Sequence, residues 1–192
     1  MKVLCLSGSA RAASFNTALL EVAAAELAAR DIDVMRIAPS DLRALPLMDQ
    51  DLESASGLPE QARALKASFH AADGIVWACP EYNGSVTPLL KNVIDWVSRP
   101  DDALPAPACF QRRPMALLAA SPGGLGGLRG LRHVREILGN LSAMVVPRQF
   151  ALAKAGDAFD AQGALRDSKN QEAVAGVMDD LLFWMQAIHG KG

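Results

Sequence analysis

The sequence contains little cysteine and few aromatic residues, and it has no long apolar run. Only three cysteines occur among 192 residues, Cys5, Cys79 and Cys109, and they form no Cys-x-x-Cys or Cys/His cluster. We therefore expect neither a bound metal nor a disulfide framework. No run reaches the ~18 apolar residues of a membrane span, and the N-terminal apolar segment is too short for a secretion signal. These absences predict a cytoplasmic protein with no membrane partner.

Neither sign of charge is in excess. The sequence has 19 Lys and Arg and 21 Asp and Glu, which gives a net charge of −2. The basic residues are scattered along the chain. Nucleic acid is therefore not an expected partner. Hydrophobic residues make up 51% of the chain, enough for one domain of this length with a full core. Because no repeat or linker interrupts the pattern, we expect residues 1–192 to form a single domain.

Short apolar runs alternate with longer segments of helical periodicity. Strands are expected at residues 2–6, 32–37, 74–79, 115–120 and 143–146. Helices are expected at residues 16–30, 58–71, 89–98, 127–139 and 168–189, with loops over 38–57 and 99–114. The alternation predicts an α/β fold, a flavodoxin-like, doubly wound, five-stranded parallel sheet of order 2-1-3-4-5 with helices on both faces. Ligands of such sheets bind beyond the carboxyl ends of the strands, near the first and third.

The first expected strand ends in SGSARAASFNTALL, which places small residues, hydroxyls and an arginine just before a helix. Hydroxyls and backbone N–H groups at a helix N-terminus bind anions, and Arg11 adds a permanent positive charge. The segment therefore predicts a phosphate site, although it is neither a P-loop nor a GxGxxG motif. The alternative is an ordinary helix cap by Ser14 or Asn16, with Arg11 in solvent.

The third expected strand ends in the stretch PEYNGS. Pro80 ends the strand, and Asn83-Gly84 is a turn dipeptide. Such a turn can present backbone N–H and C=O groups to the edge of a flat heterocycle, with Tyr82 as an aromatic wall. Glu81 could orient the turn, face a neighbouring subunit or face the ligand. An ordinary strand-to-helix turn is the alternative.

The helix expected after this turn carries an apolar stripe on one side. The stripe consists of Leu89, Leu90, Val93, Ile94 and Val97. Three residues off the stripe, Lys91, Asn92 and Asp95, are expected in solvent or, less readily, in an interface.

The fourth expected strand ends in SPGGLGG, a glycine-rich turn that allows close backbone approach. Alone it is weak evidence, because a flexible loop has the same composition. The three loops together lie at neighbouring strand tips of the expected fold. They describe a planar ligand with a phosphate at one end, and FMN fits that description.

These residues resemble the NAD(P)H-dependent FMN reductases of flavodoxin-like fold, a group that includes quinone, chromate and azo reductases. The likeness covers about residues 2–185. The matching motifs are Gly8-Ser9-x-Arg11-x-x-Ser14-x-Asn16, Leu45-Pro46-Leu47-x-Asp49-x-Asp51, Pro80-Glu81-Tyr82-Asn83-Gly84-Ser85, Leu90-Lys91-Asn92-x-x-Asp95-Trp96 and Ser121-x-Gly123-Gly124-x-Gly126-Gly127.

The resemblance implies FMN as cofactor and NADPH or NADH as co-substrate. It implies that the phosphate is held by Ser9, Arg11, Ser14, Asn16 and Thr17. It implies that the flavin ring is contacted by Pro80, Glu81, Tyr82, Asn83 and Gly84, and that its other side is closed by Ser121, Gly123 and Gly124. It also implies a homodimer or homotetramer, with the helix of residues 87–96 at the interface.

The resulting hypothesis is ping-pong two-electron transfer from NAD(P)H to a small-molecule acceptor such as a quinone, free flavin, chromate or an azo compound. Because the cofactor carries this chemistry, we expect no catalytic side chain. His70, His133 and His189 fall in expected helices, as surface or helix-end residues, and Cys79 reads as a small buried hydrophobe. The alternatives are a flavodoxin-type electron carrier, which the net charge of −2 disfavours, and a non-redox mononucleotide-binding protein.

Overall fold

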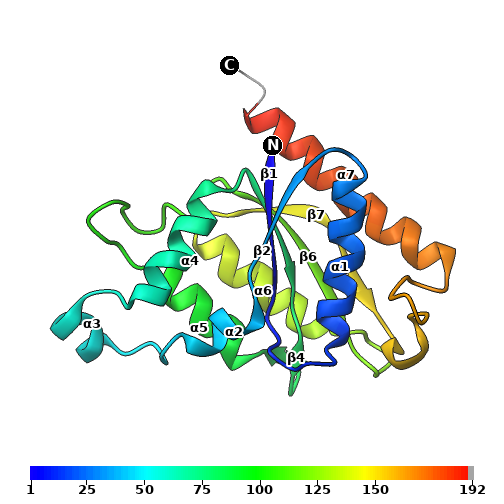
Figure 1. The fold of residues 1–192 in the computed structure, drawn as a ribbon, viewed down its shortest axis with the longest axis horizontal. Coiled ribbons are helices and arrows are strands. Elements are labelled where there is room, and N and C mark those ends of the chain that lie inside the picture. Colours follow the sequence, from blue (N-terminus) through cyan, green and yellow to red (C-terminus); the bar gives the residue numbers. More distant parts are fainter. Residues whose placement is uncertain (190–192) are drawn as a thin grey trace.

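The computed structural model describes residues 1–189, so the last three residues of the expected 1–192 domain lie outside the described residues. A parallel sheet forms its centre (Figure 1). The strands are β1 (Lys2–Ser7), β2 (Asp33–Arg36), β3 (Gly74–Ala78), β6 (Pro114–Ala120) and β7 (Met144–Leu152). Their order is β2-β1-β3-β6-β7, and every neighbouring pair is parallel. The expected order 2-1-3-4-5 is confirmed.

Helices cover both faces of the sheet, and each face has its own core (Figure 1). On one face lie α1 (Phe15–Ala28) and α7 (Ser168–His189). On the other lie α4 (Glu60–Ala71), α5 (Pro88–Val97) and α6 (Leu128–Asn140). Strands β3 and β6 are buried along their whole length, which explains why they are continuous apolar runs rather than alternating ones. No helix of residues 1–189 is both long and apolar enough to cross a membrane.

Residues 38–57, expected as a loop, contain two short helices. Helix α2 (Pro39–Ala44) begins with a proline in its first turn, where the missing N–H has no cost. Helix α3 (Gln50–Ser56) is capped by Asp49, whose carboxylate accepts a hydrogen bond from the Asp51 N–H at 2.8 Å. Both helices are too short to show a helical period, and this is why the sequence pattern did not reveal them.

Two further elements depart from the expected ones. Strand β7 continues well past residue 146, because a bulge shifts its register against β6 around Pro147. Proline has no N–H for the ladder and usually ends a strand, but a bulge accommodates it. The turn after β3 is a small hairpin of β4 (Glu81–Tyr82) and β5 (Ser85–Val86), and a short 3-10 helix, Ala155–Asp157, follows β7.

The parallel strands bring three loops to one edge of the sheet. Ser7 pairs with Ala78 across β1 and β3, and Ala78 pairs with Leu118 across β3 and β6, so the strands end almost level. The loops that follow β1, β3 and β6 therefore begin side by side, at the lower edge in Figure 1.

Candidate functional site

The three loops enclose one cavity of about 290 Å³. The expected site residues that line it are Ser9, Arg11, Ser14, Asn16, Pro80, Glu81, Tyr82 and Ser121. Phe15, Ala120 and Pro122 also line it and were not expected. Thr17, Asn83, Gly84, Gly123 and Gly124 lie outside its lining. The structure therefore brings together residues that are more than a hundred positions apart in the sequence.

The loop after β1 contains both a helix cap and uncommitted polar groups. Ser14 caps α1, with its Oγ accepting a hydrogen bond from the Thr17 N–H at 3.4 Å. The Oγ1 of Thr17 is buried and has no hydrogen-bond partner. Arg11 is exposed and lies over the ring of Phe15, 5.3 Å from its centre. The cap therefore accounts for Ser14, and Thr17 and Arg11 remain available to a ligand.

Asn16 braces two of the loops against each other. Its Nδ2 donates to the Ala120 carbonyl at 2.9 Å, and its Oδ1 accepts from the Ala120 N–H at 3.0 Å. The side chain is buried, and its NH2 and its carbonyl oxygen each form one bond with the main chain of Ala120. We expect Asn16 to shape the cavity through this brace, while its backbone remains part of the first loop.

Thr87 links the first loop to helix α5, a role that sequence reasoning missed. Its Oγ1 accepts from the Leu90 N–H at 3.3 Å as the cap of α5, and it donates to the Gly8 carbonyl at 2.9 Å. A Cβ at Gly8 would lie 3.0 Å from the side chains of Leu90 and Pro80. Only glycine allows this approach, which brings the first and second loops into contact. The sequence does contain a signal for this helix cap, because Thr87 stands directly before Pro88 and the apolar stripe of the helix.

The Asn-Gly pair forms the turn of the β4–β5 hairpin. Asn83 has φ 51° and Gly84 has φ 79°, the left-handed conformations that a two-residue type I′ turn requires. These two residues shape the hairpin and do not line the cavity. Tyr82, which is 58% exposed, borders the cavity from this hairpin.

Glu81 is held by the start of helix α6. Its Oε1 accepts from the Arg129 guanidinium, at 2.8 Å from Nη2, and its Oε2 accepts from the Gly130 N–H at 2.9 Å. Burial raises the pKa of Glu81, but the bonds from Gly130 and Arg129 outweigh it, so the pKa lies below its usual value. Of the three roles considered for Glu81, the observed contacts match the first, orientation of the turn.

The glycine-rich loop contains two kinds of glycine. A Cβ at Gly126 would lie 2.7 Å from the main chain of Ala151, and one at Gly127 would lie 2.8 Å from the Ala119 Cβ. These two glycines therefore serve packing against the sheet. Gly123 and Gly124 are exposed, and the Gly123 N–H donates to Ser121 Oγ at 3.2 Å.

Helix α5 fixes the segment that follows β2. Asn92 donates to the Pro46 carbonyl at 2.9 Å and accepts from the Met48 N–H at 2.7 Å, and Trp96 Nε1 also donates to Pro46, at 2.7 Å. The expectation that Asn92 lies in solvent or an interface was wrong, because it is buried by this segment. Lys91 does lie in solvent, paired with Asp95 at 2.6 Å.

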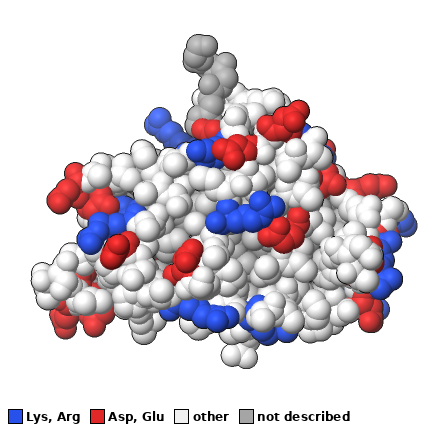
Figure 2. All heavy atoms as spheres, in the orientation of Figure 1, with Lys and Arg blue, Asp and Glu red and all other residues white. Residues whose placement is uncertain are grey.

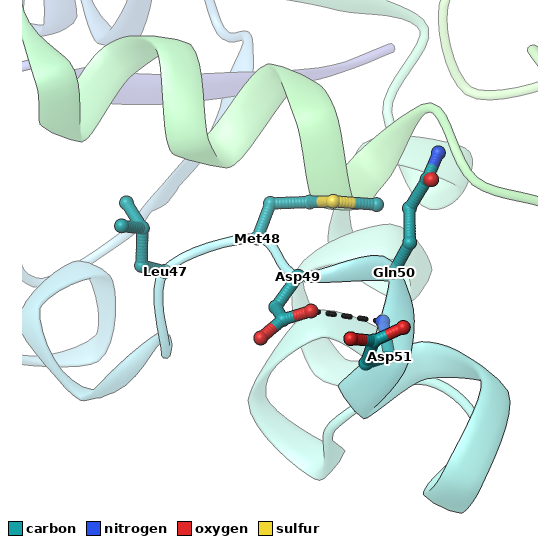
Figure 3. Close-up of a pocket in the computed structure, with 5 residues that line it drawn as sticks. All are labelled: Leu47, Met48, Asp49, Gln50 and Asp51. Carbon is teal, nitrogen blue, oxygen red and sulfur yellow. Dashed lines mark hydrogen bonds between the residues drawn. The ribbon is translucent and has the colours of Figure 1, made fainter.

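The segment fixed by α5 borders a separate, open hollow of about 560 Å³, lined by Leu47, Met48, Asp49, Gln50 and Asp51 (Figure 3). The Asp49 carboxylate is turned toward the start of α3, and Leu47 points away from the neighbouring side chains. Leu47 is 76% exposed. This hollow shares no residue with the three-loop cavity.

Cys79, His70 and His133 do not line the three-loop cavity. Burial raises the pKa of the Cys79 thiol, whose Sγ lies 3.3 Å from the Trp77 carbonyl. His70 and His133 are exposed on helices, and His133 Nδ1 lies 2.9 Å from Ser85 Oγ. Within residues 1–189, no three His, Cys, Asp or Glu residues are grouped so that they could hold a metal ion.

The chain is similar to known proteins both in sequence and in fold. The family model described as NADPH-dependent FMN reductase matches residues 1–157. The NAD(P)H-dependent FMN reductase PA1204 of Pseudomonas aeruginosa is 35% identical over 191 residues, 99% of this chain and 98% of that protein. The NADPH:quinone oxidoreductase of Arabidopsis thaliana is 34% identical over 194 residues, 100% and 95% of the two chains. FerB, a flavoenzyme NAD(P)H:(acceptor) oxidoreductase from Paracoccus denitrificans, has a similar fold, with a TM-score of 0.83 at 24% identity over 97% of both chains.

Proposed function

The chain belongs to the NADPH-dependent FMN reductase family, and we propose that it passes two electrons from NAD(P)H to quinones by a ping-pong mechanism. As a member of this family it is an oxidoreductase whose cofactor is FMN. Free flavin, chromate and azo compounds are proposed as further acceptors. The observation that carries the proposal is the meeting of three loops of matching chemistry at one cavity.

The residues of the cavity fit FMN. Thr17 lies next to the cavity lining in sequence but outside it, and its buried hydroxyl without a partner is the kind of group that a phosphate oxygen can satisfy. Arg11 has no ion pair within residues 1–189, so its charge is free to meet an anion. Pro80 and Tyr82 supply flat, apolar surface on the side where a ring would lie.

Each loop has a separate task in this proposal. Ser9, Arg11, Ser14 and Thr17 hold the phosphate, with Asn16 bracing their loop. The ring is held by Pro80 and Tyr82 on one side and by Ser121 on the other, all of which line the cavity. Glu81, Asn83 and Gly84 set the shape of the hairpin, and Gly123 and Gly124 remain proposed contacts of the ring from outside the present lining. When bound, FMN supplies the redox chemistry, accepting a hydride from NAD(P)H and passing two electrons to an acceptor.

The size of the cavity supports a shared binding place for both substrates. Small-molecule sites commonly measure about 300–1,000 Å³, and this cavity of about 290 Å³ lies just below that range. The proposal therefore has NAD(P)H and the acceptor use the same place in turn, and not side by side. A cytoplasmic location remains a prediction from the sequence.

Steady-state kinetics with FMN-loaded protein test this proposal. NAD(P)H oxidation is measured against benzoquinone, chromate, an azo dye and free FMN, at several fixed NAD(P)H concentrations. Ping-pong transfer gives parallel double-reciprocal lines, and intersecting lines would contradict it. If the protein binds FMN but oxidises no NAD(P)H with any acceptor, it is an electron carrier.

A further inference from the structure

A second arginine, absent from the expected site, contacts the first loop. Arg43 lies in helix α2, which follows the edge strand β2, and its Nη2 donates to the main-chain carbonyl of Ala10. Ala10 sits between Ser9 and Arg11 in the loop proposed to hold the cofactor phosphate. Figure 1 shows α2 and this loop at the same end of the molecule. The contact therefore ties the segment after β2 to the phosphate loop.

The charge of Arg43 is not neutralised by the protein. Within residues 1–189 neither Arg43 nor Arg11 forms an ion pair, whereas Arg36, Arg99 and Arg129 each pair with a glutamate. Asp41, on the same helix, is two positions from Arg43, a spacing at which helical side chains do not face each other. Figure 2 shows Lys and Arg side chains at the lower edge of the molecule, where Figure 1 places α2 and the loop.

A phosphate monoester carries about −1.5 to −2 at pH 7, and Arg11 supplies only +1. A second cation beside the loop would add to the attraction from Arg11, the hydroxyls and the helix N-terminus. A guanidinium has five N–H donors, and the bond to Ala10 uses one of them. Arg43 is exposed, so its remaining donors and its charge lie beside the loop without an ion-pair partner among residues 1–189.

From these contacts we propose that Arg43 is a positioning residue of the cofactor-phosphate site. It holds the first loop in its binding conformation through Ala10 and adds its charge to that of Arg11. The inference rests on the proposed FMN site and extends it to a residue of the segment after β2.

Flavin binding tests the inference without any measurement of turnover. Quenching of flavin fluorescence gives the Kd of FMN and of riboflavin, which has the same ring but no phosphate. Arg43→Ala should weaken FMN binding about five- to tenfold and should leave riboflavin binding within about twofold. Arg43→Lys, which keeps the charge, should recover part of the loss. Arg11→Ala is the positive control, with an expected loss of about tenfold to a hundredfold.

Arg63→Ala is the matched negative control. Arg63 is also exposed and also donates to a main-chain carbonyl, but that carbonyl belongs to Leu58, outside the three loops, and not to Ala10 of the first loop. It should leave both dissociation constants unchanged. The inference is overturned if Arg43→Ala binds FMN like the wild type, if it loses FMN and riboflavin equally, or if the lysine variant recovers nothing. If the wild type itself binds no FMN, the proposed function fails and this inference fails with it.

Discussion

The carboxylate of Glu81 has two partners in helix α6, the Arg129 guanidinium and the Gly130 N–H. Its side chain is only 10% exposed, so these bonds are shielded from water on most sides. They hold the hairpin, and with it Tyr82, against the start of α6. A residue that borders the cavity therefore acts mainly on the shape of the loop.

Glu81→Gln tests this role of the carboxylate. Because the folded-state pKa of Glu81 is lowered, its contribution to stability is present above the ordinary glutamate pKa and is lost as pH falls through the lowered value. At pH 7 we expect a loss of about 1–3 kcal/mol in the free energy of unfolding, measured with urea. The difference from wild type should shrink as the pH falls below the ordinary pKa of glutamate, and it should vanish below the lowered pKa of Glu81.

Asp95→Asn is the control for this substitution, because Asp95 forms an exposed pair with Lys91. Such pairs contribute about 0–1 kcal/mol. Equal losses for Glu81→Gln and Asp95→Asn would show that Glu81 does not anchor the hairpin.

The three cysteines should be inert in the folded protein. All are free and buried, and burial raises the pKa of Cys5 to about 12 and that of Cys79 and Cys109 above its usual value. Since the thiolate is the reactive form, a disulfide-exchange reagent at pH 8 should label none of them in native protein and all three in denaturant. Rapid labelling of Cys79 without denaturant would contradict its reading as a buried hydrophobe.

At the scale of elements, the segment between α5 and β6 is anchored by one buried lysine. Lys66 of α4 is 2% exposed, and its Nζ lies 3.2 Å from the Asp101 carboxylate and donates to the Arg99 carbonyl. Burial raises the pKa of Asp101, but hydrogen bonds from Leu104, Lys66 and Ala103 outweigh it, so the pKa lies below its usual value. Because α5 leads away from the three-loop edge, this anchor acts on stability and not on ligand binding.

Lys66→Met should therefore separate stability from binding. The change leaves the Arg99 carbonyl without its side-chain donor and leaves the Asp101 carboxylate with its two main-chain donors. We expect a loss of about 2 kcal/mol in the free energy of unfolding, measured with urea. The FMN dissociation constant should stay within about twofold. Lys91→Met, at an exposed pair, should cost at most about 0.5 kcal/mol. A tenfold weaker FMN affinity in Lys66→Met would show that the segment is coupled to the cavity.

The five sheet strands were predictable because β1, β3, β6 and the first part of β7 are apolar runs, and β2 has its apolar residues between charged ones. Elements without such a pattern were not. Helices α2 and α3 are each shorter than two full turns of periodic sequence, and β4 and β5 have two residues each. Pro147 made β7 look shorter than it is, since a bulge cannot be recognised from one strand alone.

For the molecule as a whole, the place of the site followed from topology, because the carboxyl ends of parallel strands meet at one edge. The contacts that individual side chains make could not be predicted from topology, because they join segments that are distant in the sequence. The Asn16 amide donates a hydrogen bond to Ala120, the Asn92 amide accepts one from Met48 in the segment after β2, and the Arg43 guanidinium donates one to Ala10. In each case the partner is a main-chain group, which leaves no trace in residue type.

The assembly is proposed from the sequence to be a homodimer or homotetramer through residues 87–96. Helix α5 buries most of its apolar side chains in the core of its own chain. Its outer side offers Pro88, Lys91 and the half-buried Asp95. The Pro46–Met48 segment is bonded to the same helix through Asn92 and Trp96, and it adds the exposed Leu47. A partner on this side would cover both surfaces and would remove the exposed Leu47 side chain from water.

Light scattering after size-exclusion chromatography measures the assembly directly. Wild type should show the mass of two or four chains. Leu47→Glu should shift the mass toward one chain, because it places a charge in the covered surface. Phe183→Glu is the matched control, since Phe183 is 61% exposed but lies on α7, on the other side of the sheet. A wild type with the mass of one chain, or dissociation caused by Phe183→Glu alone, would contradict assembly through this helix.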